Sequence, residues 1–304
     1  MKVARNAMAT PDHNQDSPGG SPKSEQAFAF VQSLATELSK GKVELPSFPD
    51  IVMRVQRVLS SEDADSAKVV RVIGAEPVLA GRVMQMANSA GLNPSGKPIT
   101  NLNSAVTRLG MNIVRSATMA FAFRQMRKAG EFRELAGPLD ELWQRSVRNA
   151  TVCFAVGRRV PRISADNALF AGLMRTVGEL YILTRARQHP QLLADAATYA
   201  SILSDWQLSI ASSVLENWGM SEELVQAVRD SGEPSTELRG QPTLADVLYA
   251  ASVLSHMEPE QLETQELPPA PLAALKRLQF DGPTYAQILR ESAAELAALR
   301  EALG

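Results

Sequence analysis

Apolar residues recur at spacings of three and four positions from Ser24 to the end of the chain, in stretches rich in Ala, Leu, Val, Met and Arg. This is the period of an α-helix that buries one face. Alternating runs of Val, Ile, Thr and Tyr between tight turns, which would indicate strands, are nearly absent, and aromatic residues make up only 5% of the chain. The pattern therefore predicts an all-α fold.

Prolines and glycines divide this pattern into separate helices, because proline fits the first turn of a helix and glycine commonly ends one. In the first part of the chain, the expected helices run from Ser24 to Gly41 and then over about 49–59, 65–73, 77–90, 100–109 and 112–128. A second group begins after Gly137 and Pro138 and covers about 139–160, 165–187, 190–203, 204–217, 221–230 and 243–257. Two or three further helices reach Leu303.

The same pattern suggests how the chain is organised into parts. Residues 1–23 are rich in Pro, Gly, Ser, Asn and Asp and carry no apolar period, which predicts a disordered tail. We expect one domain over 24–260, built from an N-terminal helical subdomain (24–130) and a second helical bundle (138–260), with a C-terminal helical extension over 261–304. The clearest internal linker is the segment 231–242, SGEPSTELRGQP.

Composition and charge narrow the choice of partners. The chain has 31 basic and 33 acidic residues and a formal net charge of -2, which gives no overall attraction to nucleic acid or to an acidic membrane. The arginine cluster at Arg158, Arg159 and Arg162 is typical of a solvated helix end, so we expect no nucleic-acid partner.

The single cysteine, Cys153, cannot form an intramolecular disulfide, and the first residues lack a secretory signal. No run approaches the ~18 apolar residues of a membrane span. We therefore expect a cytoplasmic protein without membrane contact.

Several segments together resemble a known family. They are LPSFPDIVMRVQRVL (45–59), VVRVIGAEPVLAGRVMQMANSA (69–90) and ITNLNSAVTRLGMNIVRSATMAFAF (99–123). The Leu-Pro entry, the Glu76-Pro77 step, the Ala-Asn-Ser at 87–89 and the Ala-Val-x-x-Leu-Gly at 105–110 resemble the HDOD family of bacterial signalling proteins. The resemblance continues through 168–183 and 214–234 and covers roughly residues 40 to 260.

This resemblance implies an HD-like helical bundle, related to the HD superfamily of metal-dependent phosphohydrolases. In those enzymes one His, a His-Asp pair and a late Asp hold a divalent cation that acidifies a bound water. The positions that match the pattern His-Asp-x-Gly-Lys read Arg175, Thr176, Val177, Gly178 and Glu179, and Arg145 stands where the first His would be. Only Asp246 matches a ligand position. Because a guanidinium has no lone pair to donate, the resemblance implies a degenerate site without a metal.

The histidines also predict the absence of a metal site, and this argument does not depend on the family resemblance. The three histidines, His13, His189 and His256, form no metal-spaced pair with one another or with Cys153. Cys153 lies on an apolar helix face and is expected to be a buried thiol. No Gly-x-Ser-x-Gly elbow and no P-loop is present. We therefore expect no catalytic residue, no metal and no cofactor.

Two readings remain open for the charged residues at the degenerate positions. Arg145 and Arg175 could pair with Asp246 and Glu179 in a network that joins three helices, because buried charges are normally paired. Alternatively, they could line an anion pocket for a phosphate or a nucleotide, since guanidinium groups suit phosphate, or they could be exposed. We expect the salt-bridge network.

The function expected from these observations is non-catalytic. By resemblance to HDOD proteins, the chain would be a signal-transduction or regulatory protein of bacterial pathways such as motility, stress or surface behaviour, and its partners would be other signalling proteins. This predicts an exposed apolar or Met-lined groove between the two subdomains, although Met84, Met86, Met111, Met119 and Met126 are spaced as core residues. The alternatives are a nucleotide or cyclic-dinucleotide sensor that does not hydrolyse its ligand, and a metal-dependent phosphohydrolase or phosphodiesterase.

Overall fold

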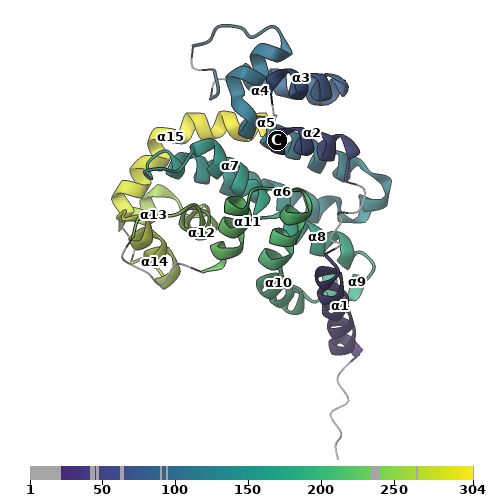
Figure 1. Ribbon diagram of the computed structural model, residues 1–304. Coiled ribbons are helices and arrows are strands. Elements are labelled where there is room, and N and C mark those ends of the chain that lie inside the picture. The colour runs from purple at the N-terminus through teal and green to yellow at the C-terminus, as the bar shows by residue number, and fades with distance from the viewer. Residues whose placement is uncertain are drawn as a thin grey trace, which may run out of the picture.

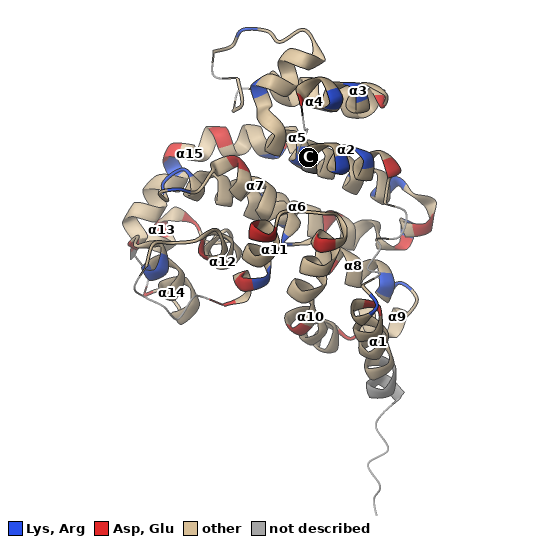
Figure 2. Cartoon of the chain, in the orientation of Figure 1, with Lys and Arg blue, Asp and Glu red and all other residues tan. Residues whose placement is uncertain are grey.

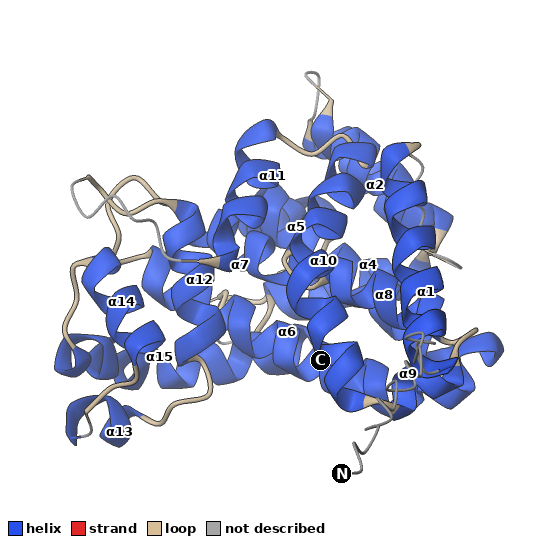
Figure 3. Cartoon of the chain, turned by 90° about the horizontal axis from the view of Figure 1, so that it is seen from below, coloured by secondary structure: helices blue, strands red, loops and turns tan. Residues whose placement is uncertain are grey.

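The computed structural model of the chain describes residues 22–41, 45, 48–61, 65–89, 91–93, 95–233, 240–264 and 266–303. These residues form helices joined by turns and loops, with no strand among them (Figure 3). The expectation of an all-α fold is therefore confirmed. The predicted tail lies outside the described residues up to position 21, as do residues 234–239 of the predicted linker.

The helices follow the predicted order closely. The first five are α1 (Pro22–Ser39), α2 (Asp50–Ser60), α3 (Ser66–Gly74), α4 (Pro77–Ala87) and α5 (Leu102–Lys128). A 3-10 turn, η1 (Gly130–Leu135), leads to α6 (Ala136–Gly157), α7 (Ala165–Met174), α8 (Val177–Ala186), α9 (Pro190–Ala194), α10 (Ala196–Asn217) and α11 (Glu222–Arg229). After η2 (Asp230–Gly232) come α12 (Leu244–Leu254), α13 (Pro259–Thr264), α14 (Pro269–Leu278) and α15 (Gly282–Leu303).

Capping side chains explain several helix starts. The Asp65 carboxylate accepts a hydrogen bond from the backbone N–H of Lys68 at 2.6 Å, and the Asn101 side chain accepts from the N–H of Ser104 at 2.8 Å. Such N-caps satisfy backbone donors that the first turn leaves unpaired. Gly110 interrupts α5 with φ 75°, a left-handed conformation that glycine adopts without strain. The two helices predicted on either side of Gly110 therefore meet at a kink.

One predicted helix is wrong in an informative way. The segment 165–187 was expected to be continuous, but the structure divides it at Arg175 and Thr176 into α7 and α8. Thr176 has φ -90° and ψ -2°, a conformation at the margin of the helical region. No proline or glycine marks this break in the sequence, which is why periodicity alone missed it. Farther along, the expected helices 190–203 and 204–217 are replaced by the short α9 and the long α10.

Helix α6 lies at the centre of the fold and packs against α5, α7, α8, α12 and α15. From Asn149 to Gly157 every residue of α6 is buried, so this part of the helix is enclosed on all sides. Helices α2 to α4 and the first half of α5 form an upper lobe, and α10 to α14 lie below it (Figure 1). The candidate site lies where α6, α7 and α8 meet.

The two ends of the described chain are packed differently from the predicted division into parts. Helix α1 packs against α9 and α10 of the second bundle, although it was assigned to the N-terminal subdomain. Helix α15 packs on α6 and reaches α4 and α5. It is held to the residues directly after α6 by a bidentate pair between Arg158 and Glu295, at 2.6 and 2.7 Å, and by a second pair between Arg159 and Glu291. The C-terminal helix therefore joins both parts of the predicted domain.

The expected Met-lined groove is not found in the described part of the chain. Met86, Met119 and Met126 are buried and Met84 and Met111 half-buried, as core residues would be. The exposed large hydrophobic residues are Phe28, Val78 and Leu272, which belong to three different helices. Scattered exposed residues of this kind do not form a contiguous apolar patch. No helix in the described ranges is long and apolar enough to span a bilayer.

Candidate functional site

Helix α6 presents Arg145 and Ser146 side by side at the candidate site. The Arg145 side chain is half-exposed, and its Nη2 donates to Oε1 of Glu179 on α8. Ser146 is fully buried, and its hydroxyl lies 2.8 Å from the hydroxyl of Thr176. The Thr176 hydroxyl also donates to the backbone carbonyl of Leu173 at 2.9 Å. An ion pair at the surface and a pair of hydroxyls beneath it therefore connect α6 to the α7–α8 junction.

Glycine at position 178 allows α8 to lie against α10. A Cβ atom placed on Gly178 would stand 1.8 Å from the backbone oxygen of Gln207 and 2.8 Å from the backbone nitrogen of Ala211. The two backbones thus approach each other more closely than any side chain permits. This contact brings Tyr199 of α10 near the Arg145–Glu179 pair. Burial raises the pKa of the Tyr199 phenol, and the nearby Glu179 carboxylate raises it further.

Arg175 does not join this ion pair. Its Nε donates to the hydroxyl of Ser231 at 3.0 Å, and its Nη2 donates to the Ser231 carbonyl at 3.3 Å. Ser231 is buried in η2, and its hydroxyl donates in turn to the carbonyl of Val228. Burial lowers the pKa of the Arg175 guanidinium, with Cys153 and Glu179 acting in the opposite direction. Arg175 therefore joins the end of α7 to the end of α11.

Asp246 takes part in none of these contacts and has a partner that the sequence did not suggest. Its Oδ2 accepts hydrogen bonds from the backbone N–H and the hydroxyl of Thr243, at 2.7 and 2.8 Å, in a capping box at the start of α12. Its Oδ1 lies 3.0 Å from Nε of Arg277 on α14. The two side chains are 3% and 7% exposed, so this is a buried ion pair. The remaining Arg277 nitrogens donate to the carbonyls of Gly240 and Gln241.

The expected three-helix network is therefore only partly present. The Arg145–Glu179 pair forms, but Asp246 pairs with Arg277, and Arg175 is held by Ser231. The five candidate residues therefore fall into three separate sets of contacts, and the arginine that pairs with Asp246 comes from α14 and not from α6 or α7. This difference matters for stability, because the deeply buried ion pair is Asp246–Arg277 and not Arg145–Glu179.

A cleft lies where the upper lobe, the α6–α7 pair and α15 meet. Its volume is about 620 Å³, and its lining includes Leu92, Arg108, Phe154, Asp166 and Glu295. Burial raises the pKa of Asp166, against the attraction of Arg158. Apolar and charged groups are mixed in this lining, so the cleft is not the apolar groove predicted between the subdomains.

Comparison with known proteins identifies the family. A sequence model of the HDOD domain matches residues 45–234. The chain belongs to the HDOD family. It also shares 22% identity over 294 residues with an uncharacterised protein of Treponema pallidum (strain Nichols), which covers 89% of this chain and 54% of that protein. This HDOD chain thus spans about half the length of that relative.

Solved structures show the same fold. A Shewanella amazonensis SB2B protein, provisionally described as a metal-dependent phosphohydrolase, matches with a TM-score of 0.68 and 22% identity over 92% of this chain and 100% of that one. An HDOD domain protein of unknown function from Geobacter sulfurreducens matches with a TM-score of 0.60 and 20% identity over 92% and 99%. A Marinobacter aquaeolei VT8 protein, provisionally described as a signal transduction protein, matches at 0.59 and 21% over 91% and 66%. These similarities establish the HD-like fold.

The residues that the resemblance matches to metal-binding positions do not fit a divalent metal. Metal ligands must offer lone pairs, and the guanidinium groups of Arg145 and Arg175 have none. Within the described ranges, His, Cys, Asp and Glu side chains form no group of three that could hold a metal ion. Asp246, the one matching ligand residue, already has both carboxylate oxygens engaged. His189 instead packs edge-on against Phe30, and His256 is exposed.

Sequence reasoning missed four residues that pair with the candidate residues or lie near them. They are Ser146, Tyr199, Ser231 and Arg277. Arg277 carried a usable signal, because it stands in the apolar run Leu272–Leu278, on the side of the helix that carries Ala274 and Leu278. The others are serines and a tyrosine without distinctive spacing, and only the packing of α6, α10 and η2 brings them to the site.

Proposed function

We propose that this HDOD protein is a non-catalytic signal-transduction protein that acts through contacts with other proteins. The observation that carries the proposal is the Arg145–Glu179 ion pair, because the resemblance matches Arg145 to the first metal-binding His of HD enzymes. A permanent positive charge there repels a divalent cation and has no lone pair to coordinate it. Without an acidified water, the site lacks the nucleophile of phosphohydrolase chemistry.

The cleft where the upper lobe, the α6–α7 pair and α15 meet is the place that we assign to a partner. It is bordered by α5, α6, α7 and α15, so an occupant would contact four helices at once. Its mixture of apolar and charged side chains is typical of interfaces that form and dissociate. A bound protein would therefore change how the upper lobe is positioned against α6, α7 and α15, and this change would carry the signal.

Catalysis is tested with the purified full chain. Hydrolysis of a chromogenic phosphodiester and of cyclic dinucleotides would be measured with Mn²⁺, Fe²⁺ and Mg²⁺, for the wild type and for Glu179→Gln. We expect no turnover above the background of the buffer. Turnover that disappears in Glu179→Gln would overturn the non-catalytic proposal.

Partner contact is tested by cross-linking in the native cell. The substitution Leu92→Glu places a charge at the rim of the cleft, and Leu272→Glu places the same charge on α14, where Leu272 is 41% exposed. We expect a signalling protein to be captured by the wild type and by Leu272→Glu, and to be lost with Leu92→Glu. Equal capture of the partner by Leu92→Glu and Leu272→Glu would contradict the proposal that the cleft binds it.

Ligand sensing is tested by calorimetry. A panel of nucleotides and cyclic dinucleotides would be titrated into the wild type and into Arg145→Ala, because Arg145 is the half-exposed guanidinium of the site. We expect no binding, since Glu179 already holds this guanidinium and Ser231 holds that of Arg175. Binding that is lost in Arg145→Ala would make the protein a sensor.

A further inference from the structure

A second pocket lies on the face of α15 opposite to the cleft. The α15 residues that line it share one face of the helix: Leu289, Ala293, Leu296 and Arg300. Glu291 and Glu295, which line the cleft, lie about half a turn away around the same helix. The pocket has a volume of about 480 Å³, which is in the range of pockets that hold small ligands. It is therefore separate from the place assigned to a partner protein.

Helix α6 and the connection between α12 and α13 complete this pocket. Arg148 and Val152 line it from α6, one helical turn apart. Ser255 begins the connection, and its hydroxyl donates to Oδ1 of Asn149, the residue that follows Arg148. His256 comes next and also lines the pocket. The connection is therefore fixed against the turn of α6 that carries Arg148.

A chain of hydrogen bonds brings Arg300 to the same turn of α6. Its Nε donates to the hydroxyl of Thr151 at 3.4 Å, and that hydroxyl donates to the carbonyl of Arg148 at 2.9 Å. Burial lowers the pKa of the Arg300 guanidinium, and repulsion by Arg148 lowers it further, against a weaker attraction by Glu258. An anion beside the two arginines would relieve this repulsion. We call this site the Arg148–Arg300 pocket.

Acidic side chains leave the charge of the Arg148–Arg300 pocket uncompensated. Within the described ranges neither arginine forms an ion pair, and the lining sets one acidic residue, Glu258, against the two of them. Helix α15 carries charges of both signs (Figure 2). The glutamates of α13 and α15 that other arginines hold are Glu260 and Glu263, with Arg290, and Glu291 and Glu295, with Arg159 and Arg158. Glu301 is exposed and does not line the pocket. The lining is therefore positively charged even with His256 neutral.

We propose that the Arg148–Arg300 pocket binds a small phosphate monoester through its phosphate group. Guanidinium groups offer paired N–H donors that match phosphate oxygens, and α6 and α15 each supply one such group. Apolar lining residues would contact an apolar body of the ligand: Val152, Met257, Pro259, Leu289, Ala293 and Leu296. The proposal goes beyond the proposed function and does not depend on it.

Other anions match this pocket less well. A phosphate monoester carries about -1.5 to -2 charges at pH 7, whereas a carboxylate or a sulfate ester carries one and offsets only one of the two arginines. A nucleotide base is commonly bound by stacking on an aromatic side chain, and the residues that line the pocket include none. The charges and the aliphatic wall together therefore favour a phosphate on an apolar body.

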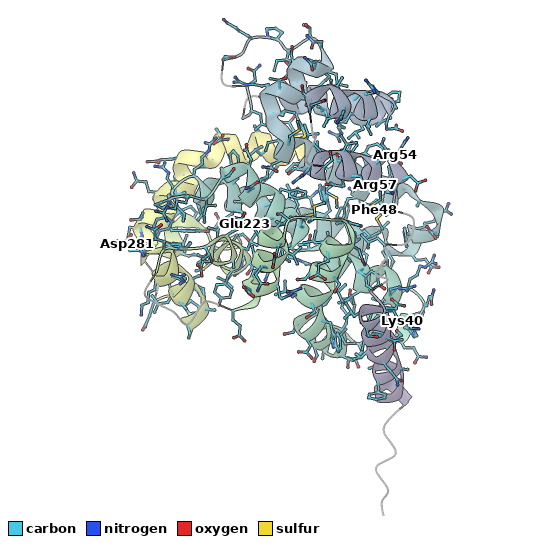
Figure 4. All side chains as sticks on the ribbon, in the orientation of Figure 1. Lys40, Phe48, Arg54, Arg57, Glu223 and Asp281 are labelled. Carbon is cyan, nitrogen blue, oxygen red and sulfur yellow. The ribbon has the colours of Figure 1, made fainter. Side chains whose placement is uncertain are left out.

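The test is calorimetric titration of phenyl phosphate into the full chain. Phenyl sulfate is the probe with the same ring and a smaller charge, and inorganic phosphate is the probe without the apolar body. The test variant is Arg148→Gln/Arg300→Gln. The control is Arg54→Gln/Arg57→Gln, which makes the same change in net charge at exposed positions of α2 (Figure 4). If the test variant fails to fold, Ala293→Phe narrows the pocket and leaves its charges unchanged.

We expect the wild type and the control to bind phenyl phosphate with equal affinity, and the test variant to bind it at least about tenfold more weakly. Phenyl sulfate should bind the wild type at least about tenfold more weakly than phenyl phosphate. Ala293→Phe should weaken the binding of phenyl phosphate more than that of inorganic phosphate. Absence of phenyl phosphate binding at millimolar concentrations, equal weakening by the control, or equal affinity for phenyl sulfate would each overturn the proposal.

Discussion

Asp246 forms an ion pair deep in the fold. The resemblance places this carboxylate at a metal-ligand position, and in the structure it caps α12 and pairs with Arg277. An isolated buried charge costs several kcal/mol, so each member of this pair stabilises the other. The Arg145–Glu179 pair is different, because water reaches the half-exposed Arg145 and weakens the interaction.

Asp246→Asn is therefore expected to lower the free energy of unfolding by about 3 kcal/mol, because it leaves the Arg277 guanidinium buried without a counter-charge. Urea denaturation followed by circular dichroism measures the change. Arg145→Gln, which breaks the half-exposed pair, should cost less than about 1 kcal/mol. The double variant Asp246→Asn/Arg277→Met should recover part of the loss. A wild-type melt for Asp246→Asn would contradict this assignment.

The reactivity of Cys153 is a second prediction at this scale. Burial raises the pKa of this thiol to about 12, although Arg175 acts against the shift. The reactive thiolate is therefore scarce in the folded protein at ordinary pH. We expect no reaction with a disulfide reagent between about pH 7 and 9 in buffer, and full reaction in guanidinium chloride, where the pKa returns to about 8.5. Rapid labelling of the folded chain would show that Cys153 is accessible.

The sequence predicted these residues unevenly, for physical reasons. The expectation that Arg145 and Arg175 hold no metal depends only on residue identity, and it stays a prediction. The Arg145–Glu179 pair was also foreseen. The partner of Asp246 was not, because Arg277 lies on a helix beyond the matched family segment, and only packing of α14 against α12 brings the two together.

Elements are positioned at this site by close backbone contact. Gly178 allows α8 to touch α10, and the break at Arg175 and Thr176 turns α8 so that this contact can form. The helix periodicity of the sequence gave the order of the elements correctly, because it reports which faces are buried. It missed the break because tertiary packing, and not a proline or a glycine, imposes it.

Gly178→Ala should therefore be strongly destabilising. Its methyl group would overlap the backbone of Gln207, which cannot move without displacing α10. We expect a loss of about 3 kcal/mol or more in unfolding free energy, measured by urea denaturation. Gly81→Ala on α4 is the matched control, because a Cβ there meets no atom within 4 Å and alanine favours the helix by up to about 1 kcal/mol. Equal unfolding free energies for the two variants would contradict the close contact between α8 and α10.

At the scale of the whole molecule, the C-terminal helices complete the fold although the family match ends at residue 234. Helix α14 supplies Arg277, and α15 buries Tyr285, Leu299 and Leu303 against the rest of the protein. A chain cut after residue 268 should therefore expose apolar core residues and leave the Asp246 carboxylate without its counter-charge. We expect it to lose cooperative thermal unfolding, as followed by circular dichroism. A fragment that melts as sharply and as high as the full chain would contradict this.

The central claim is our proposal that Arg145 and Glu179, which the resemblance matches to metal-site positions of HD enzymes, form an ion pair that leaves no room for a metal, and its most direct test is the metal content of the full chain. The protein would be produced in medium supplied with iron, manganese and nickel, purified without chelator and analysed by mass spectrometry. The Arg145–Glu179 pair predicts far less than one metal ion per chain, unchanged in Glu179→Gln. One tightly held iron, manganese or nickel ion per chain would contradict it.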